Sequence, residues 1–168
     1  SRAGAYMIQR NYDKAYLDYK KLSETSATTD IPDVQEGLAI VSSHIGKLDD
    51  AEKAYEKLLK KNASPVTQIN LAELYIVRGK YEKALKLLDS DTLLRSADKF
   101  MKCISSYLAA SALLATGKDS GEYMKVFNEL LPQFRKGTED IDWDTALFEK
   151  WLKTAKLPQG AAEKIADM

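Results

Sequence analysis

The sequence predicts an all-α fold built from antiparallel helix pairs, and three observations support this prediction. Apolar residues recur with helical spacing through long stretches rich in Ala, Leu, Lys and Glu, which are good helix formers. Only 8 Gly and 4 Pro occur among the 168 residues, and most of them lie between these stretches. A block of residues also recurs in register. Val, Ile and Thr nowhere alternate with polar residues for long enough to indicate a sheet.

The recurring block spans one helix, a short turn and a second helix. The same offset of 33 positions relates Leu38-Ala39 to Leu71-Ala72, Gly46 to Gly79, and Ala51 to Ala84. A glycine after the first helix can adopt the left-handed conformation that ends a helix. A small Ala early in the second helix lets two helices approach closely. We therefore expect Leu38, Leu71 and Ala109 in the core, and Ala51 and Ala84 where paired helices touch.

This pattern of Leu-Ala, Gly-Lys, Ala and a bulky residue resembles the tetratricopeptide repeat, which has a period of about 34 residues. The unit around Gly79 matches best, whereas the unit around Gly46 has Ser42 where an aromatic residue is expected. The resemblance covers roughly residues 2–131 and is strong for 34–91. It implies a right-handed superhelix, an α-solenoid, whose first helices line a concave groove that binds proteins.

A partial unit precedes the two clear ones. Ala3 and Ala15 fall 36 positions before Ala39 and Ala51, and Arg10 replaces the turn glycine. A Ser- and Thr-rich loop over 23–30 accounts for the three extra residues. The first helix of this unit would need residues before Ser1, so we expect a chain cut from a longer protein or beginning just after processed residues.

The last repeat is degenerate and leads into a different segment. Its helices are expected over about 96–116 and 120–134, so residues 1–136 form the repeats and 137–168 a C-terminal cap. Asp142 is a good N-cap for a helix carrying Trp151, Pro158 ends that helix, and 161–168 form a short one. Trp143, Leu147, Phe148 and Trp151 are too apolar to be left in water, so we expect them to close the core.

Composition narrows the function classes. The 25 basic and 25 acidic residues cancel, whereas nucleic-acid binders usually carry a basic excess. The single cysteine excludes an internal disulfide and a cysteine-based zinc cluster. No apolar run approaches the roughly 20 residues needed to cross a bilayer, and no signal peptide is visible. We expect a soluble, cytoplasmic protein without nucleic acid or inserted membrane as a partner.

Residues that could carry chemistry lack the partners that chemistry needs. His44 is the only histidine, and no motif supplies an orienting group for a general base. Asp140, Asp142 and Asp144 have the spacing that opens a calcium loop, but the required Gly and the Glu at the twelfth position are missing. Cys103 lies on an apolar helix and is expected to be a buried, inert thiol. We therefore predict no enzyme, no metal site and no cofactor.

Function is predicted on the groove wall, beside the core positions of the first helices. The predicted peptide-binding residues are Ile40, His44, Asn70, Glu73, Val77, Tyr107 and Ser111. Gly37 is expected beside Ile40, and Met7 and Ile8 extend the wall. Some relatives bind chaperone tails through a carboxylate clamp, but Asn70 matches only one of its five residues. An amphipathic helix or an extended apolar peptide of a partner protein is the better expectation.

Four alternatives stay open from the sequence. In the first, the wall residues are solvated surface. In the second, the chain's own C-terminal helix covers them. In the third, the chain is a regulatory or substrate-docking segment of a larger enzyme. In the fourth, the groove receives a helix from a second copy of the chain.

Overall fold

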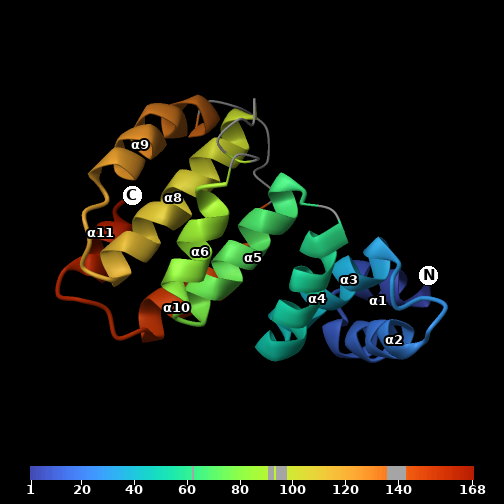
Figure 1. Ribbon diagram of the computed structural model, residues 1–168. Coiled ribbons are helices and arrows are strands. Elements are labelled where there is room, and N and C mark those ends of the chain that lie inside the picture. Colours follow the sequence, from blue (N-terminus) through green and yellow to red (C-terminus); the bar gives the residue numbers. More distant parts are fainter. Residues whose placement is uncertain (62, 91–92, 94–97, 136–142) are drawn as a thin grey trace. The chain divides into compact units, whose positions relative to one another are not determined.

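The computed structural model describes residues 1–61, 63–90, 93, 98–135 and 143–168. Within these residues the chain is helical and contains no strand, which confirms the predicted all-α class. The helices follow one another along the chain and form two compact units, Ser1–Ala63 and Ser64–Met168, drawn in Figure 1. Each unit is described by itself below.

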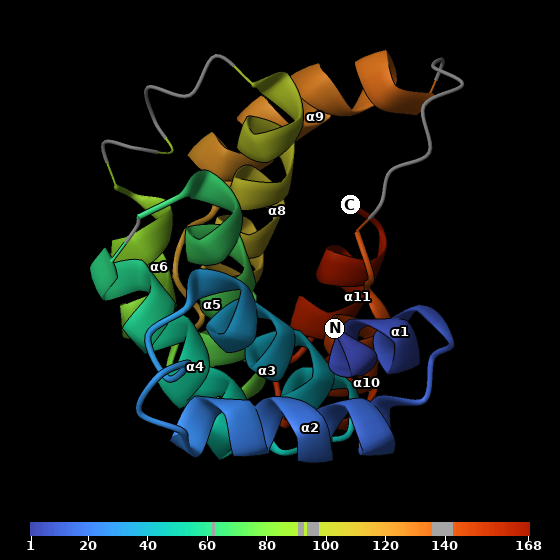
Figure 2. The ribbon, with the colours of Figure 1, turned by 90° about the vertical axis from the view of Figure 1, so that its right-hand side faces the viewer.

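Unit 1 contains two antiparallel helix pairs. The pairs are α1 (Arg2–Ile8) with α2 (Tyr12–Glu24), and α3 (Pro32–His44) with α4 (Leu48–Lys61). Each helix packs against the next, and α1 also contacts α3 (Figure 2). The predicted partial unit is therefore present, with a first helix of 7 residues.

Unit 2 contains two further pairs and a C-terminal segment. Its helices are α5 (Pro65–Val77), α6 (Tyr81–Leu88), α8 (Lys99–Ala115), α9 (Gly121–Arg135), α10 (Ala146–Thr154) and α11 (Ala161–Ala166). Helix α5 pairs with α6 and α8 with α9, and α8 packs on both helices of the preceding pair. Helix pairs that pack in chain order are the architecture expected of a helical repeat.

The turns inside the pairs confirm the predicted register. Gly46, Gly79 and Gly117 have positive φ values of 76°, 70° and 69°, the left-handed conformation that glycine adopts without steric cost. Arg10 takes the equivalent place in the first pair with φ 56°. A side chain in this conformation costs roughly 1–2 kcal/mol, so the first turn is held by its surroundings rather than by local preference.

The residues expected in the core are buried. Ala51 and Ala84 are both 0% exposed, as required where paired helices touch. Leu38, Leu71 and Ala109 are buried as well. The first and second helices of the repeats therefore pack through the positions that the sequence pattern predicted.

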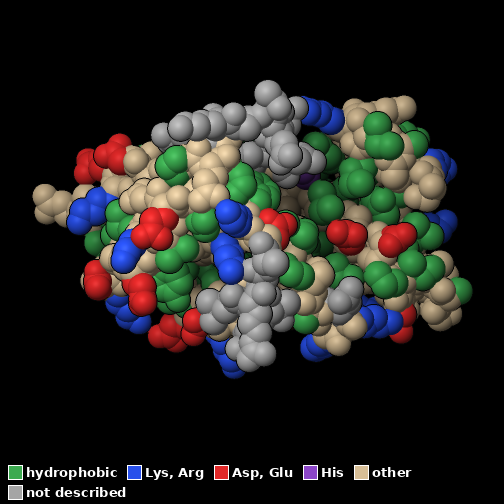
Figure 3. All heavy atoms as spheres, turned by 90° about the horizontal axis from the view of Figure 1, so that it is seen from above, with side chains coloured by type: hydrophobic (Ala, Val, Ile, Leu, Met, Phe, Trp, Pro, Cys, Tyr) green, Lys and Arg blue, Asp and Glu red, His purple; other side chains and the backbone are tan. Residues whose placement is uncertain are grey.

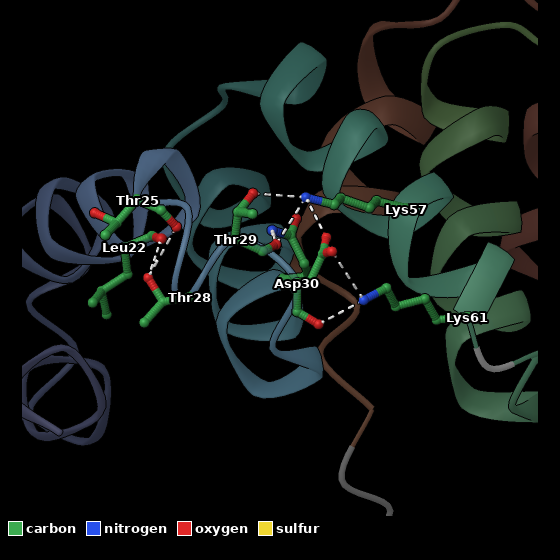
Figure 4. A network of polar contacts seen from close by, with 8 residues as sticks. Leu22, Thr25, Thr28, Thr29, Asp30, Lys57 and Lys61 are labelled. Carbon is green, nitrogen blue, oxygen red and sulfur yellow. Dashed lines mark hydrogen bonds and ion pairs between the residues drawn. The ribbon is translucent and has the colours of Figure 1, made fainter.

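The Ser- and Thr-rich loop after α2 is fixed to α4. The carbonyl oxygen of Thr29 accepts hydrogen bonds from Gln35 Nε2 at 2.6 Å and from Lys57 Nζ at 2.8 Å. The Asp30 carboxylate lies 3.1 Å from Lys57 Nζ and 3.5 Å from Lys61 Nζ (Figure 4). The hydrogen bond from Lys57 holds the pKa of Asp30 below its usual range. These contacts explain how three extra residues fit without disturbing the packing of α3.

Two predicted helix starts fall partly outside the described residues. Ser96 and Asp142 are among the undescribed positions, as is Asp140. Within the described part, Asp98 caps α8 by accepting hydrogen bonds from the N–H groups of Phe100 and Met101 at 2.8 and 3.2 Å. Asp144 accepts the N–H of Ala146 at 3.0 Å where α10 begins.

Candidate functional site

The predicted wall residues lie on the first helices of both units. The first-helix face of unit 1 consists of Met7, Ile8, Ile40 and His44 on α1 and α3. The first-helix face of unit 2 consists of Asn70, Glu73, Val77, Tyr107 and Ser111 on α5 and α8. The surroundings of these two faces differ.

The first-helix face of unit 1 is apolar and accessible. Ile8 is 84% exposed, and Met7 and Ile40 are half-buried. The exposed ring of His44 stacks on Tyr12, with ring centroids 4.1 Å apart and planes at 4°. Because α1 contacts α3, these side chains come from two adjacent helices. The face offers apolar anchors beside one flat polar ring.

Gly37 does not belong to this face. A Cβ atom built on Gly37 would lie 2.3 Å from the Tyr19 ring, so Gly37 lies where α2 and α3 pack. The prediction that it lines the groove was wrong. The large aromatic side chain of Tyr19 reaches across α3, and only a glycine leaves space for it.

The C-terminal segment covers the first-helix face of unit 2. Helix α10 contacts α5, and α11 contacts α8 (Figure 1). Phe148, Trp151 and Ile165 of this segment are 2%, 5% and 0% exposed. The Tyr107 hydroxyl donates a hydrogen bond to the carbonyl oxygen of Ile165 at 3.3 Å. The segment predicted as a cap thus packs on the first helices of two pairs.

An aromatic cluster forms the centre of this contact. The Tyr107 ring centroid lies 5.3 Å from Phe127, 5.8 Å from Trp143 and 5.5 Å from Phe148. Phe148 in turn lies 4.9 Å from Trp151. Such pairs contribute about 0.5–1.5 kcal/mol each beyond the area they bury. Burial raises the pKa of Tyr107 to about 12, so its phenol stays neutral and keeps donating at neutral pH.

Glu73 is the one acidic residue of this face, and it is buried, with 7% of its surface exposed. Its Oε2 accepts a hydrogen bond from Trp143 Nε1 at 3.0 Å. Its Oε1 is buried and accepts no hydrogen bond from the described residues. Burial is the main cause that raises the pKa of Glu73 to about 7, and the nearby Asp144 carboxylate also raises it, whereas the hydrogen bond from Trp143 lowers it.

The remaining predicted residues of unit 2 are less informative. Asn70 and Val77 are half-buried. Ser111 is 0% exposed, and its Oγ donates to the Tyr107 carbonyl oxygen at 2.8 Å. Peptide binding by the seven predicted residues stays a prediction. Coverage of the wall by the chain's own C-terminal segment was one of the alternatives left open from the sequence, which did not identify the contacts of Trp143 and Ile165 with this face.

Among the candidates for chemistry, the structure describes His44, Cys103 and Asp144. Cys103 is buried, as predicted, and burial raises the pKa of its thiol, which keeps it protonated and unreactive. In the parts of the chain that the structure describes, no three His, Cys, Asp or Glu side chains gather as a metal site. Acidic and basic side chains are interspersed on the face shown in Figure 3. Within those same parts, no helix is both long and apolar enough to cross a membrane.

Comparison with known proteins identifies the repeat. Residues 46–96 match the family model described as a tetratricopeptide repeat, a span that includes the best-matching unit around Gly79. No curated protein matches the chain. Tetratricopeptide repeats are stacked helix pairs that present binding surfaces to other proteins, so the match points to a scaffold for protein–protein interaction with protein partners.

Proposed function

We propose that the chain binds an amphipathic helix or an extended apolar peptide of a partner protein on the first-helix face of unit 1. The observation that carries this proposal is the exposure of Ile8, which presents 84% of its surface to solvent beside Met7 and Ile40. Single exposed apolar residues are common. On this face the exposed Ile8 and the half-buried Met7 and Ile40 come from two adjacent first helices, and apolar surface gathered in this way is typical of a binding site.

The chemistry of the face suits an amphipathic ligand. Ile8, Met7 and Ile40 are apolar anchors, and a helical ligand offers apolar residues three and four positions apart to such anchors. The His44 ring, held flat against Tyr12, adds one polar ring to this apolar face. Binding energy at such surfaces is concentrated in a few buried anchors, so we expect Ile8 to contribute strongly.

The proposal makes the chain a binding module and not an enzyme. Its net charge of zero supports a protein ligand over a nucleic acid, whose phosphates demand a basic surface.

Charge substitution at Ile8 tests the proposal with little risk to the fold, because the side chain is already in water. A partner is first recovered by pull-down with the parent chain. Ile8→Glu should then weaken binding at least tenfold, or about 1.4 kcal/mol, with an unchanged denaturation midpoint. Leu17→Glu is the matched control, since Leu17 is 66% exposed on α2, the second helix of the same pair.

Two outcomes would contradict the proposal. Equal binding by Ile8→Glu and the parent would remove the face as the site, as would a loss confined to Leu17→Glu. The mass of the chain in solution at several concentrations decides between a foreign partner and a second copy. A dimer that Ile8→Glu dissociates would make the occupant another copy of this chain.

A further inference from the structure

We propose that residues 143–168 form a proton-dependent latch on the first-helix face of unit 2, held while Glu73 is protonated and loosened when Glu73 ionises. This inference concerns unit 2 alone and is independent of the proposed function of unit 1. It rests on the geometry of the contact between α5, α8 and the C-terminal segment.

The Glu73 carboxyl is placed where a proton stabilises the contact. Trp143 Nε1 donates a hydrogen bond to Oε2 of Glu73 at 3.0 Å. Oε1 of Glu73 is buried and accepts no hydrogen bond from the described residues. A buried, ionised carboxylate with one hydrogen bond is costly, because it loses most of its hydration. A protonated carboxyl carries no net charge and still accepts the indole N–H. Burial of Glu73 under the docked segment therefore favours the neutral acid, although the indole N–H by itself favours the ionised form.

The other titratable groups around Glu73 do not compensate its charge. Helix α8 contributes Tyr107, whose phenol stays neutral because burial raises its pKa to about 12. The residues before α10 contribute Asp144, whose carboxylate raises the pKa of Glu73. Helix α10 contributes Glu149, whose negative charge raises the pKa of Tyr107, as the charge of Glu73 also does. Ionised Glu73 would thus add negative charge beside the Asp144 carboxylate.

The sign of the pH dependence follows from proton binding. In the docked state Glu73 holds its proton up to about pH 7, whereas a hydrated glutamate loses it near pH 4.3. The docked state therefore binds more protons between these values. Docking is strongest below about pH 4.3, weakens as pH rises, and levels off above about pH 7. These two pKa values predict a docking equilibrium that falls about tenfold between pH 6 and pH 8.

The chain carries its own probe for this equilibrium, because its 2 tryptophans, Trp143 and Trp151, both lie in the segment. We expect acrylamide quenching of tryptophan fluorescence in the full chain to increase as pH rises from 5.5 and to level off above about pH 7. Glu73→Gln keeps an acceptor for the indole N–H and cannot ionise, so its quenching should stay low and constant. His44→Gln is the control, since it removes the only histidine and should leave the profile unchanged.

A second variant separates titration of Glu73 from a merely structural role. Trp143→Phe leaves Trp151 as the reporter and removes the N–H that favours the ionised carboxylate. Loss of that N–H disfavours ionised Glu73 in the docked state, so quenching should go on rising above pH 7 instead of levelling off. Circular dichroism of each variant establishes that the helices are intact. A flat profile in the parent, a profile in Glu73→Gln equal to that of the parent, or quenching in Trp143→Phe that levels off at the same pH as in the parent would each overturn the latch.

Discussion

The two first-helix faces carry equivalent positions in opposite environments. Ile40 in unit 1 and Glu73 in unit 2 lie 33 positions apart and occupy the same place in the repeat. The apolar residue is half-buried, whereas the acidic residue is buried and accepts a hydrogen bond from Trp143. Repeat register therefore decides which side chains point from a first helix, and the rest of the chain decides whether that face is available to a partner.

The largest loss of stability is expected from a substitution at the centre of the first-helix face of unit 2. Phe148→Ala should lower the free energy of unfolding by about 3–5 kcal/mol, because its ring is 2% exposed between Tyr107 and Trp151. Leu17→Ala in unit 1 is the control and should cost less than about 0.5 kcal/mol, as its side chain is largely in water. Urea denaturation measures both, and equal costs would show that the segment does not pack as described.

A smaller loss of stability is expected at the contacts inside the helix pairs, which should be alike in both units although the first-helix faces differ. Ala84→Leu in unit 2 and Ala51→Leu in unit 1 should each cost about 1–3 kcal/mol, since both alanines are 0% exposed between paired helices. Thermal or urea unfolding provides the comparison. If only one substitution is destabilising, the shared repeat register fails in the other unit.

The smallest effect concerns a polar contact of unit 1. The Asp50 carboxylate accepts hydrogen bonds from the Tyr16 hydroxyl at 2.7 Å and from Lys20 Nζ at 3.0 Å. The hydrogen bond from Tyr16 lowers the pKa of Asp50, which Lys20 lowers further. Asp50→Asn should cost about 0.5–1 kcal/mol at pH 7.

The stability lost in Asp50→Asn should depend on pH. A lowered native pKa stabilises the fold above the ordinary aspartate value near 3.9, and this stability is lost as pH falls through the native pKa. The difference between Asp50→Asn and the parent should therefore narrow in acid. A gap that persists unchanged at pH 3 would contradict ionic stabilisation by Asp50.

Much of the fold could be predicted because its signals are local. Glycines mark the turns, small alanines mark the helix contacts, and the spacing of Leu38 and Leu71 marks the core. These features recur within one repeat and need no knowledge of distant contacts. The sequence pattern also predicted that 137–168 pack on the rest of the chain, because aromatic residues such as Trp151 and Phe148 are unstable in water.

The location of the C-terminal segment could not be predicted in the same way. Its contacts join residues 58 positions apart, as between Tyr107 and Ile165, or 70 positions apart, as between Glu73 and Trp143, and no local pattern encodes such pairs. The raised pKa of Glu73 is a consequence of this docking. Gly37 was misplaced for a similar reason, since helical spacing alone does not show that the Tyr19 ring fills the space beside it.

Hydrogen exchange after removal of residues 143–168 tests the contrast between the two faces most directly. We predict that amides of α5 and α8 exchange faster in the shortened chain, because loss of α10 and α11 uncovers Tyr107 and its neighbours. Amides of α1 and α3 should keep their exchange rates. Unchanged protection of α5 and α8 would contradict a C-terminal segment that covers the first-helix face of unit 2.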